Sequence, residues 1–330
     1  MKALGYTEAH SLEHFNLRLM DLPDPNSVGR DVLVEIKAVG LNPIDYKIRS
    51  RRSGSEGQPV ILGWDAAGVV RARGKEATRF NVGDEVYYSG DLIRPGSYAD
   101  LQLVDERLVS LKPRNLSFVE AAALPLTSLT AYEMLFEKMR LTSTDKRTIL
   151  IIGGAGGVGS QAIQLLKLKT SMAVIATASR PESIQWVSSL GANHVVPHQN
   201  FASDIRARGI EFVDFIFSTT HSGQHWLNMA DIIAPFGEIG LIDEGDGVDF
   251  SLLKRKSVSI HWELMFTKSM FDYRADTQGE ILAEVRALIE SGRMRTTANK
   301  VLNGLTVENI REGHTRLEQH TSIGKMVVQL

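Results

Sequence analysis

One segment near the middle of the chain restricts the fold more than any other. Residues 148–152 form an apolar run, a glycine-rich turn follows directly, and residues 158–169 then have the composition of an amphipathic helix. Within the turn, Gly154, Gly156 and Gly159 match the pattern G-x-G-x-x-G in the context that the pattern requires, between a strand and a helix. The sequence therefore predicts a strand–turn–helix unit whose bare backbone can approach a phosphate group at the helix N-terminus.

Each glycine of the pattern has its own steric reason. A side chain at Gly154 would clash in the tight turn, one at Gly156 would hold the backbone away from a pyrophosphate, and Gly159 allows the helix and strand to pack closely. The predicted phosphate-binding segment comprises Gly154, Ala155, Gly156, Gly157, Val158 and Gly159.

Two other interpretations of this turn are possible. One is a glycine-rich turn that binds nothing. The other is a nucleoside-triphosphate loop, but Ser160 and Gln161 stand where such a loop needs Lys and Ser or Thr for the phosphates and magnesium. The sequence therefore favours a dinucleotide over phosphoryl transfer.

The end of the next predicted strand, 173–178, indicates which dinucleotide. An NAD site would place an acidic residue there to accept hydrogen bonds from the ribose hydroxyls, but the strand ends at Ala178. Ser179 and Arg180 instead offer a hydroxyl and a guanidinium to a 2′-phosphate. This pattern favours NADP(H) as the cofactor, the alternative for Arg180 being a solvated residue before Pro181 at a helix start.

Strand and helix patterns alternate through this half of the chain, which is typical of a doubly wound parallel sheet. We expect helices at 158–169, 182–190 and 224–233. The six expected strands are 148–152, 173–178, 194–196, 213–217, 238–242 and 258–262.

The first part of the chain has a different period. Short apolar runs broken at Gly, Pro and Asp predict an antiparallel, barrel-like arrangement with one short helix starting near Pro43. Its expected strands are 31–39, 67–70, 85–88, 97–104 and 108–111. After the parallel sheet we expect helices at 280–291 and 306–319 and a last strand at 325–328 that return to the first domain. The predicted domains are 1–122, 123–268 and 269–330.

Composition narrows the functional classes. The 330 residues include 37 Lys and Arg against 39 Asp and Glu, so no excess of charge favours nucleic acid or an anionic membrane as a partner. Cysteine is absent, which excludes disulfides, thiolate nucleophiles and cysteine-ligated zinc. No apolar run approaches the ~20 residues of a membrane helix, and the N-terminal segment is too polar for a signal peptide. We expect a cytoplasmic enzyme with a small-molecule substrate.

Several further segments, together with the glycine turn, resemble the medium-chain dehydrogenase/reductase superfamily, and within it the zinc-free quinone oxidoreductase branch. These segments are 40–50, 63–70, 81–88, 96–104 and 124–133, in that order. The resemblance implies an α/β protein with a GroES-like β-barrel catalytic domain, a Rossmann domain with a six-stranded parallel sheet, and a C-terminal return to the barrel. It also implies a homodimer or homotetramer.

The zinc-bearing relatives hold their catalytic metal through cysteines and a histidine. At the matching places this chain has Asn42 to Asp45 and Gly63 to Asp65. Asp45 and Asp65 could hold a hard cation through oxygen, yet two carboxylates without a supporting cluster are a poor zinc site. We therefore expect no zinc and no metal ligands, although proteins of this kind are often labelled zinc-type alcohol dehydrogenase-like.

The resemblance also implies roles for single residues. Asn42 and Thr130 would approach the nicotinamide amide or the substrate, and His198 would help to bind the 2′-phosphate, its alternative being an exposed loop histidine. The remaining candidates lie at the carboxyl edge of the predicted sheet, where such sheets bind ligands, and are Ser218, Thr219 and Leu241.

Histidines recur at a spacing of four. The three pairs are His10 and His14, His194 and His198, and His221 and His225. None of them has the acidic or third ligand of a metal motif, so we expect solvated or hydrogen-bonded histidines.

Without zinc, a simple alcohol or ketone loses its Lewis acid, and plain alcohol oxidation becomes a weak hypothesis. The sequence favours hydride transfer from NADPH to a quinone or an α,β-unsaturated carbonyl, whose negative charge spreads onto an oxygen that hydrogen bonds can stabilise. The catalytic candidates are Asn42, Tyr46 and Lys47, although Tyr46 and Lys47 could also be ordinary residues of an amphipathic helix. The alternatives are an NADPH-binding redox-sensing or structural protein with little turnover, and a zinc-type alcohol dehydrogenase.

Overall fold

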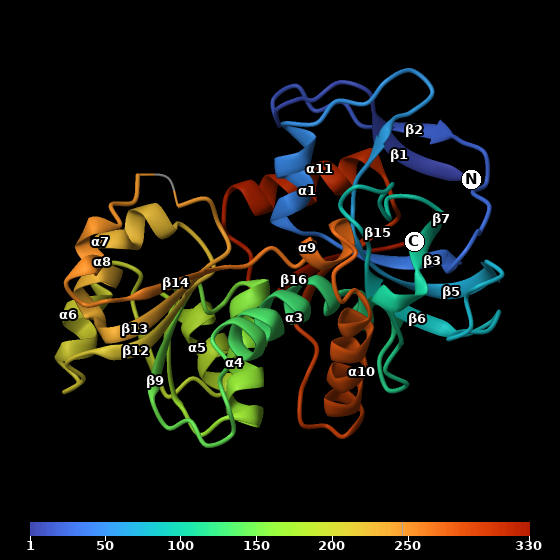
Figure 1. Cartoon of the computed structure of the whole chain (residues 1–330). Helices are drawn as coiled ribbons and strands as arrows, with labels where there is room; N and C mark the ends of the chain where they lie inside the picture. Colours follow the sequence, from blue (N-terminus) through green and yellow to red (C-terminus); the bar gives the residue numbers. More distant parts are fainter. Residues whose placement is uncertain (246) are drawn as a thin grey trace. The chain divides into compact units, whose positions relative to one another are not determined.

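A computed structural model describes residues 1–245 and 247–330 of the chain (Figure 1). The described residues form two compact units. The first comprises Met1–Leu129 together with Phe266–Leu330, and the second comprises Thr130–Met265. The chain passes between the units after Leu129 and after Met265, whereas the sequence placed boundaries after residues 122 and 268. The C-terminal segment belongs to the same unit as the N-terminal one.

The second unit contains a six-stranded parallel sheet with the order β11-β10-β9-β12-β13-β14. Its central strands are buried on both faces, as their unbroken apolar sequences require. All six expected strands are present: β9 Thr148–Ile152, β10 Ala173–Thr177, β11 His194–Val196, β12 Val213–Ser218, β13 Ile233–Leu241 and β14 Ser259–Trp262. Strand β13 begins earlier than expected, because its first pairing with β12 precedes an irregularity in register.

Helices cover both faces of this sheet, α4 and α5 on one side and α6 and α7 on the other (Figure 1). The three expected helices are α4, α5 and α7, and the sequence patterns gave no sign of the short helices α6 and α8. A core cluster between the sheet and α6, α7 and α8 includes Phe201, Trp226 and Leu253. The bounds are α4 Gly157–Lys169, α5 Pro181–Ser189, α6 Phe201–Arg206, α7 Ser222–Ile232, α8 Ser251–Lys254 and the π-helical turn η2 Glu133–Lys138.

The strand order reverses at β9, because the chain fills one half of the sheet from β9 to β11 and then continues with β12 on the other side of β9. At such a reversal the connections after the two neighbouring strands leave toward opposite faces, and ligands of open α/β sheets bind in the resulting crevice at the carboxyl ends. The glycine turn follows β9 at this point.

The first unit is built on a larger, mostly antiparallel sheet with the order β15-β16-β3-β5-β6-β8, to which β7 adds by pairing with β3. A second sheet has the order β2-β1-β4. The strands are β1 Lys2–Tyr6, β2 Arg18–Asp21, β3 Asp31–Gly40, β4 Val60–Ile61, β5 Asp65–Arg73, β6 Glu85–Ser89, β7 Leu101–Asp105, β8 Val109–Leu111, β15 Ala298–Asn303 and β16 Lys325–Gln329.

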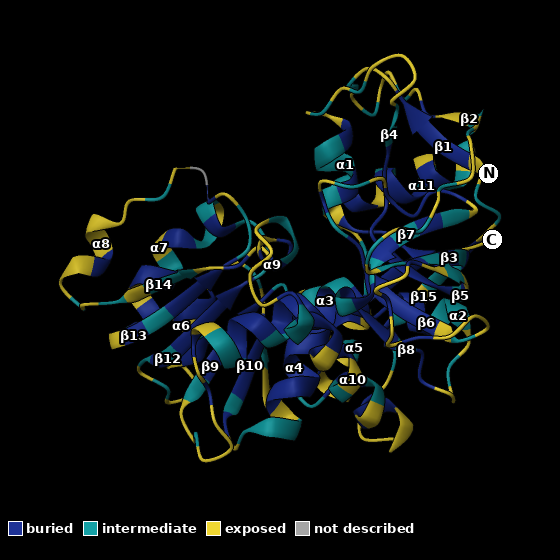
Figure 2. Cartoon of the chain, turned by 45° about the vertical axis from the view of Figure 1, so that its right-hand side comes forward, coloured by how far each residue is buried: buried dark blue, intermediate teal, exposed yellow. Residues whose placement is uncertain are grey.

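The interior of this unit is closed by segments from both ends of the chain, and Figure 2 shows the strands around it as largely buried. Tyr87 on β6, for example, is fully buried and donates a hydrogen bond to the carbonyl of Leu282 on α10 at 2.6 Å. The helices are α1 Pro43–Arg49, η1 Glu106–Leu108, α2 Phe118–Ala122, α9 Thr267–Met270, α10 Asp276–Glu290 and α11 Val307–Glu318, while α3 Pro125–Tyr132 spans the passage between the units.

The structure confirms the predicted α/β class, with a mostly antiparallel sheet in one unit and a six-stranded parallel sheet in the other. It corrects several elements of the barrel. The expected strand 97–104 is shorter, since β7 begins at Leu101 and Ala99 makes only an isolated bridge to Ala3. Strands β1, β2 and β15 were not predicted, because their sequences lack a clear alternation, and β4, which has only two residues, was not predicted either. No helix in the described residues is long and apolar enough to cross a membrane.

Candidate functional site

The turn after β9 is more tightly constrained than the sequence pattern suggests. The left-handed backbone conformation falls on Gly153, at φ +76°, and its N–H donates to Thr177 Oγ1 at 2.9 Å. The sequence assigned the tight turn to Gly154. A Cβ at Gly154 would instead lie 2.8 Å from the Cβ of Ala176, so this glycine is needed for packing against β10.

The other two glycines of the pattern differ from each other. A Cβ at Gly159 would lie 2.4 Å from the carbonyl oxygen of Gly153, so only glycine lets α4 start so close to the end of β9. A Cβ at Gly156 would meet only that same oxygen, at 3.4 Å, which is ordinary contact. Packing within the protein therefore does not require glycine at 156.

Gly156 is also the N-cap of α4 and has no side chain with which to cap it. The first amides of a helix have no partner within the helix, so those of α4 can bind an anion. An open backbone approach and an uncapped helix N-terminus together suit a pyrophosphate.

Three predicted residues lie after the carboxyl ends of β10 and β11. Ser179 Oγ accepts the backbone N–H of His198 at 3.1 Å, which brings these two residues together. Arg180 follows Ser179, its side chain is 46% exposed, and its Nε lies 3.4 Å from the carboxylate of Glu182. Burial lowers the pKa of His198, and the charges of His221 and Arg180 lower it further. A hydroxyl, a guanidinium and an imidazole thus occur at one edge of the sheet.

The candidates after β12 and β13 are engaged within the protein. Thr219 Oγ1 donates to the carbonyl of Ile152 at 2.7 Å, which joins the end of β12 to the end of β9. Ser218 Oγ lies 2.8 Å from Ser222 Oγ, and Leu241 is fully buried in the core. Leu241 therefore offers only its backbone to a ligand. The roles of these residues remain predictions, as does that of Thr130, which is almost buried in α3.

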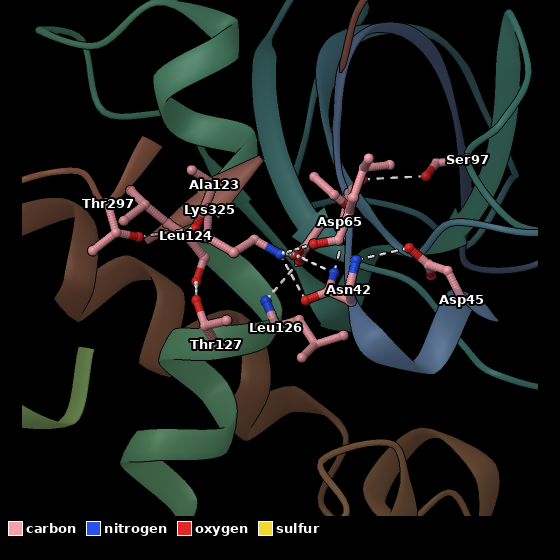
Figure 3. A network of polar contacts seen from close by, with 12 residues as sticks. Asn42, Asp45, Asp65, Ser97, Ala123, Leu124, Leu126, Thr127, Thr297 and Lys325 are labelled. Carbon is pink, nitrogen blue, oxygen red and sulfur yellow. Dashed lines mark hydrogen bonds and ion pairs between the residues drawn. The ribbon is translucent and has the colours of Figure 1, made fainter. Parts of the chain in front are cut away.

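In the first unit, the structure reveals a buried cation that sequence analysis missed (Figure 3). The ammonium group of Lys325, on β16, lies 2.7 Å from the carbonyl of Leu41, 2.6 Å from Asn42 Oδ1 and 3.1 Å from Asp65 Oδ2. Lys325 is 4% exposed and Asp65 is completely buried. An ammonium group has three donors, and three acceptors surround this one. We call Lys325, Asn42, Asp65 and Leu41 the lysine cluster.

The remaining polar atoms of the cluster also have partners. Asn42 Nδ2 donates to Asp65 Oδ2 at 2.8 Å, and the backbone N–H of Leu126 donates to Asp65 Oδ1 at 2.7 Å. Asn42 is 1% exposed and is the N-cap of α1. The structure thus gives its side chain a positioning role at the start of α1, while the predicted contact with nicotinamide or substrate remains a prediction.

Asp45, in the first turn of α1, connects to a second buried network. Its Oδ2 accepts the backbone N–H of Asn42 at 2.8 Å and the hydroxyl of Tyr98 at 3.0 Å, whereas its Oδ1 has no hydrogen-bond partner. Burial raises the pKa of Asp45 to about 7. Tyr98 lies 3.3 Å from the ring of His314, which contacts Arg49, and burial lowers the pKa of His314 to about 3.

Tyr46 and Lys47 follow Asp45 on α1 and are both half-buried. Asp45 and Arg49 form the buried side of this short helix, so Tyr46 and Lys47 lie away from that side. Their partial exposure is compatible both with a catalytic role and with ordinary helix packing, and the role stays a prediction.

Comparison with known proteins identifies the family to which the chain is related. Residues 29–114 match the model of the alcohol dehydrogenase GroES-like domain, and residues 157–279 match that of the zinc-binding dehydrogenase. A zinc-type alcohol dehydrogenase-like protein of Staphylococcus aureus is 35% identical, and the alignment covers 100% of both chains. An NADPH-dependent alkenal/one oxidoreductase of Arabidopsis thaliana is 28% identical over 99% of this chain and 79% of that protein.

Solved structures agree with this. A Rhizobium etli protein provisionally described as a zinc-dependent alcohol dehydrogenase has a TM-score of 0.96 and 45% identity, covering 100% of this chain and 98% of the other. A quinone oxidoreductase of Pseudomonas syringae has a TM-score of 0.85 and 25% identity, covering 100% and 99%.

The barrel, the parallel sheet with its glycine turn and these relatives define an oxidoreductase with a GroES-like and a Rossmann domain. More particularly, the chain belongs to the medium-chain dehydrogenase/reductase superfamily.

Several of the names above contain the word zinc, so we tested whether this chain could hold that metal. At the places where zinc-bearing relatives are expected to carry ligands, Asn42 and Asp65 already surround the ammonium of Lys325. Among the described residues, no group of three or more His, Cys, Asp or Glu side chains could hold a metal ion. The residues present do not suit a catalytic zinc, because a protonated lysine fills the position at which their oxygens converge.

Proposed function

We propose that this protein is an NADPH-dependent reductase of quinones or α,β-unsaturated carbonyls that works without a metal. The oxidoreductase class follows from the family, and the proposal concerns the cofactor, the acceptor and the absence of a metal. The relatives named above as an alkenal/one oxidoreductase and a quinone oxidoreductase support this choice of acceptors.

One observation carries the cofactor assignment. The carboxyl end of β10 has Ala178 where an NAD site needs an acid, and the exposed hydroxyl of Ser179 and guanidinium of Arg180 follow it. A carboxylate at this place would repel a 2′-phosphate, whereas a guanidinium binds it by charge-assisted hydrogen bonds. The open backbone at Gly156 supports the same cofactor through its pyrophosphate.

The lysine cluster supports the metal-free part of the proposal. A reductase without a Lewis acid needs an acceptor whose developing negative charge is delocalised, and both quinones and enones meet this requirement. When bound, NADPH would supply a hydride to the conjugated carbon, and a proton would complete the reduction at the oxygen or the adjacent carbon.

Within the chain, we assign proton donation and oxygen stabilisation to the half-buried side chains of Tyr46 and Lys47 on α1. Lys47 offers an ammonium and Tyr46 a hydroxyl, and either can donate a hydrogen bond to a developing enolate or phenolate oxygen. A tyrosine with an ordinary pKa of ~10 is a useful acid only if a neighbouring cation, here Lys47, or the cofactor ribose assists it. Asn42 and Asp65 then act indirectly, by fixing the N-terminus of α1.

The test is a pair of measurements on the purified protein. Loss of NADPH absorbance is followed with a panel of quinones, enals, enones and simple ketones, and the affinities for NADPH and NADH are compared by fluorescence titration. We expect NADPH to bind more tightly than NADH and to be consumed with conjugated acceptors but not with simple ketones. Tight binding of NADPH with no consumption on any acceptor would instead indicate a redox-sensing or structural protein.

A further inference from the structure

Three histidines gather at the carboxyl edge of the parallel sheet, in the segments after β11 and β12. The rings of His198 and His225 are stacked, with centroids 6.1 Å apart and an interplanar angle of 23°. Phe201 meets the ring of His225 edge-on at 5.8 Å. His221 Nδ1 lies 2.7 Å from Thr220 Oγ1 immediately before α7. We call His198, His221 and His225 the histidine cluster.

The cluster adjoins the predicted phosphate-binding residues of the same unit. The backbone of His198 donates to Ser179 Oγ, the residue before Arg180. All three histidines are half-buried, and within the described residues no hydrogen bond is made by the ring nitrogens of His198 or His225. Two stacked rings with uncommitted nitrogens beside a serine and an arginine form a site suited to an anion.

Without a ligand, the charges around the cluster favour neutral rings. Burial, together with the charges of His198 and His221, lowers the pKa of His225 to about 4, while Asp243 acts in the opposite direction. Burial and the charges of His221 and Arg180 lower the pKa of His198 as well. Asp243 is already engaged as the acceptor of the Ser222 backbone N–H at 2.9 Å, and Glu182 lies beside Arg180. The neutral rings can therefore take up a proton when an anion binds beside them.

We propose that His225 and His198 form a titrating half of the 2′-phosphate site, so that binding of NADP(H), but not of NAD(H), takes up a proton. This inference rests on the proposed cofactor and adds His225 as a residue that determines specificity. A phosphate beside the rings would stabilise their protonated forms, which donate hydrogen bonds from both nitrogens.

The sign of the pH effect follows from linkage. If the complex binds more protons than the free protein, affinity for NADPH falls as pH rises between the lower pKa of the free rings and the higher pKa of the bound ones. The second ionisation of the phosphate, near pH ~6, acts in the opposite direction below that value. Preference for NADPH over NADH should therefore decrease from about pH 6 to pH 8.

The experiment is calorimetric titration of the full chain with NADPH and with NADH, near pH 7, in buffers of different ionisation enthalpy. We expect the NADPH heat to depend on the buffer in the sense of proton uptake, by up to about one proton per coenzyme, and the NADH heat not to depend on it. The fragments 2′,5′-ADP and 5′-AMP should repeat this contrast, since they differ by the same phosphate.

Two variants sharpen the test. His225→Gln should reduce the proton uptake and weaken NADPH about 10-fold, the usual effect of one charge-assisted hydrogen bond, with NADH affected much less. His194→Gln is the matched control, because His194 is exposed at the opposite, amino end of β11 and should change neither quantity. The wild-type titration decides the question even if a variant does not fold.

The outcomes separate the two claims. NADPH binding that is tighter than NADH binding but independent of buffer would overturn the role of the histidines and leave the proposed cofactor standing. Equal proton uptake with NADH, or equal behaviour of the two variants, would also overturn it. A failure of NADPH to bind at all would overturn the inference together with the proposed function.

Discussion

The functional candidates of one unit and the lysine cluster of the other differ in how far their polar groups are exposed and paired. In the parallel-sheet unit, the residues expected to bind the cofactor phosphates lie at strand ends, where Arg180 is 46% exposed and Gly156 leaves its backbone open. In the barrel unit, Lys325 and Asp65 are buried, and the ammonium group of Lys325 and both carboxylate oxygens of Asp65 have hydrogen-bond partners within the protein. A side chain that is fully paired within the protein has little left for a ligand, so we expect the strand-end residues to serve binding and the lysine cluster to serve the stability of its unit.

This contrast predicts that substitutions in the two regions separate stability from binding. The largest effect is expected for Lys325→Met. It leaves the carboxylate of Asp65 buried without its cation and should lower the free energy of unfolding by about 3–5 kcal/mol. Chemical denaturation measures this change.

Two further variants control this experiment. Arg206 and Asp231, in the parallel-sheet unit, form an ion pair with similar distances, 2.7 and 2.9 Å, but on the surface. Arg206→Met should therefore change stability by only about 0–1 kcal/mol. Lys325→Met combined with Asp65→Asn should be less destabilised than Lys325→Met alone. Equal losses for Lys325→Met and Arg206→Met would contradict the contrast between the regions.

A pH-dependent effect of the barrel network comes next in size. Burial raises the pKa of Asp45 from 3.8 to about 7, so the stability that this group contributes is complete below about pH 4 and is lost as pH rises through 7. Relative to Asp45→Asn, the wild type should lose up to about 4 kcal/mol between pH 4 and 7. His314 titrates in both proteins, so the difference in their unfolding free energies isolates Asp45. A pH-independent difference would show that Asp45 is charged throughout.

Within the glycine turn, the contrast can be tested between neighbours. Gly159→Ala puts a Cβ 2.4 Å from the Gly153 carbonyl and should cost about 1–3 kcal/mol of stability. Gly156→Ala meets nothing closer than 3.4 Å and should cost less than about 1 kcal/mol while weakening NADPH at least about 10-fold. Thermal unfolding and coenzyme titration of both variants test this. A stable Gly156→Ala protein with normal NADPH affinity would mean that the pyrophosphate does not approach this backbone.

The smallest effect on stability is expected at Arg180. Its side chain is nearly half exposed, so Arg180→Ala should leave the unfolding free energy within about 0.5 kcal/mol of the wild type. The variant should nevertheless bind NADPH about 10-fold more weakly while retaining its affinity for NADH. If both coenzymes lose affinity equally, Arg180 does not recognise the phosphate.

The same contrast explains what the sequence could predict. The strands of the parallel sheet are short apolar runs separated by amphipathic helices, and β9 and β11 match their expected bounds. These patterns depend only on residues close together in the sequence, so they can be recognised without the structure. The start of β13 was missed because Pro235 and Gly237 break the apolar run between Ile233 and Leu241. The left-handed turn at Gly153 adjoins the pattern of glycines but is not part of it.

The lysine cluster of the barrel was harder to predict from the sequence, because the residues that contact one another there are far apart in the chain. Lys325 meets Asp65 across 260 residues and Leu41 across 284. Nothing in the segment around Lys325 distinguishes it from an exposed lysine of a C-terminal strand. The resemblance to the superfamily indicated that metal ligands were missing near Asn42 and Asp65, but only the structure shows that an ammonium group occupies their place.

The central claim is that reduction depends on NADPH and on no metal. The most direct test measures zinc content and the rate of NADPH oxidation with an enone or quinone on the same sample, before and after dialysis against a strong chelator. We expect the rate to be unchanged and zinc to be far below one equivalent per chain throughout. A rate that falls on chelation and returns when zinc is added back would contradict the account.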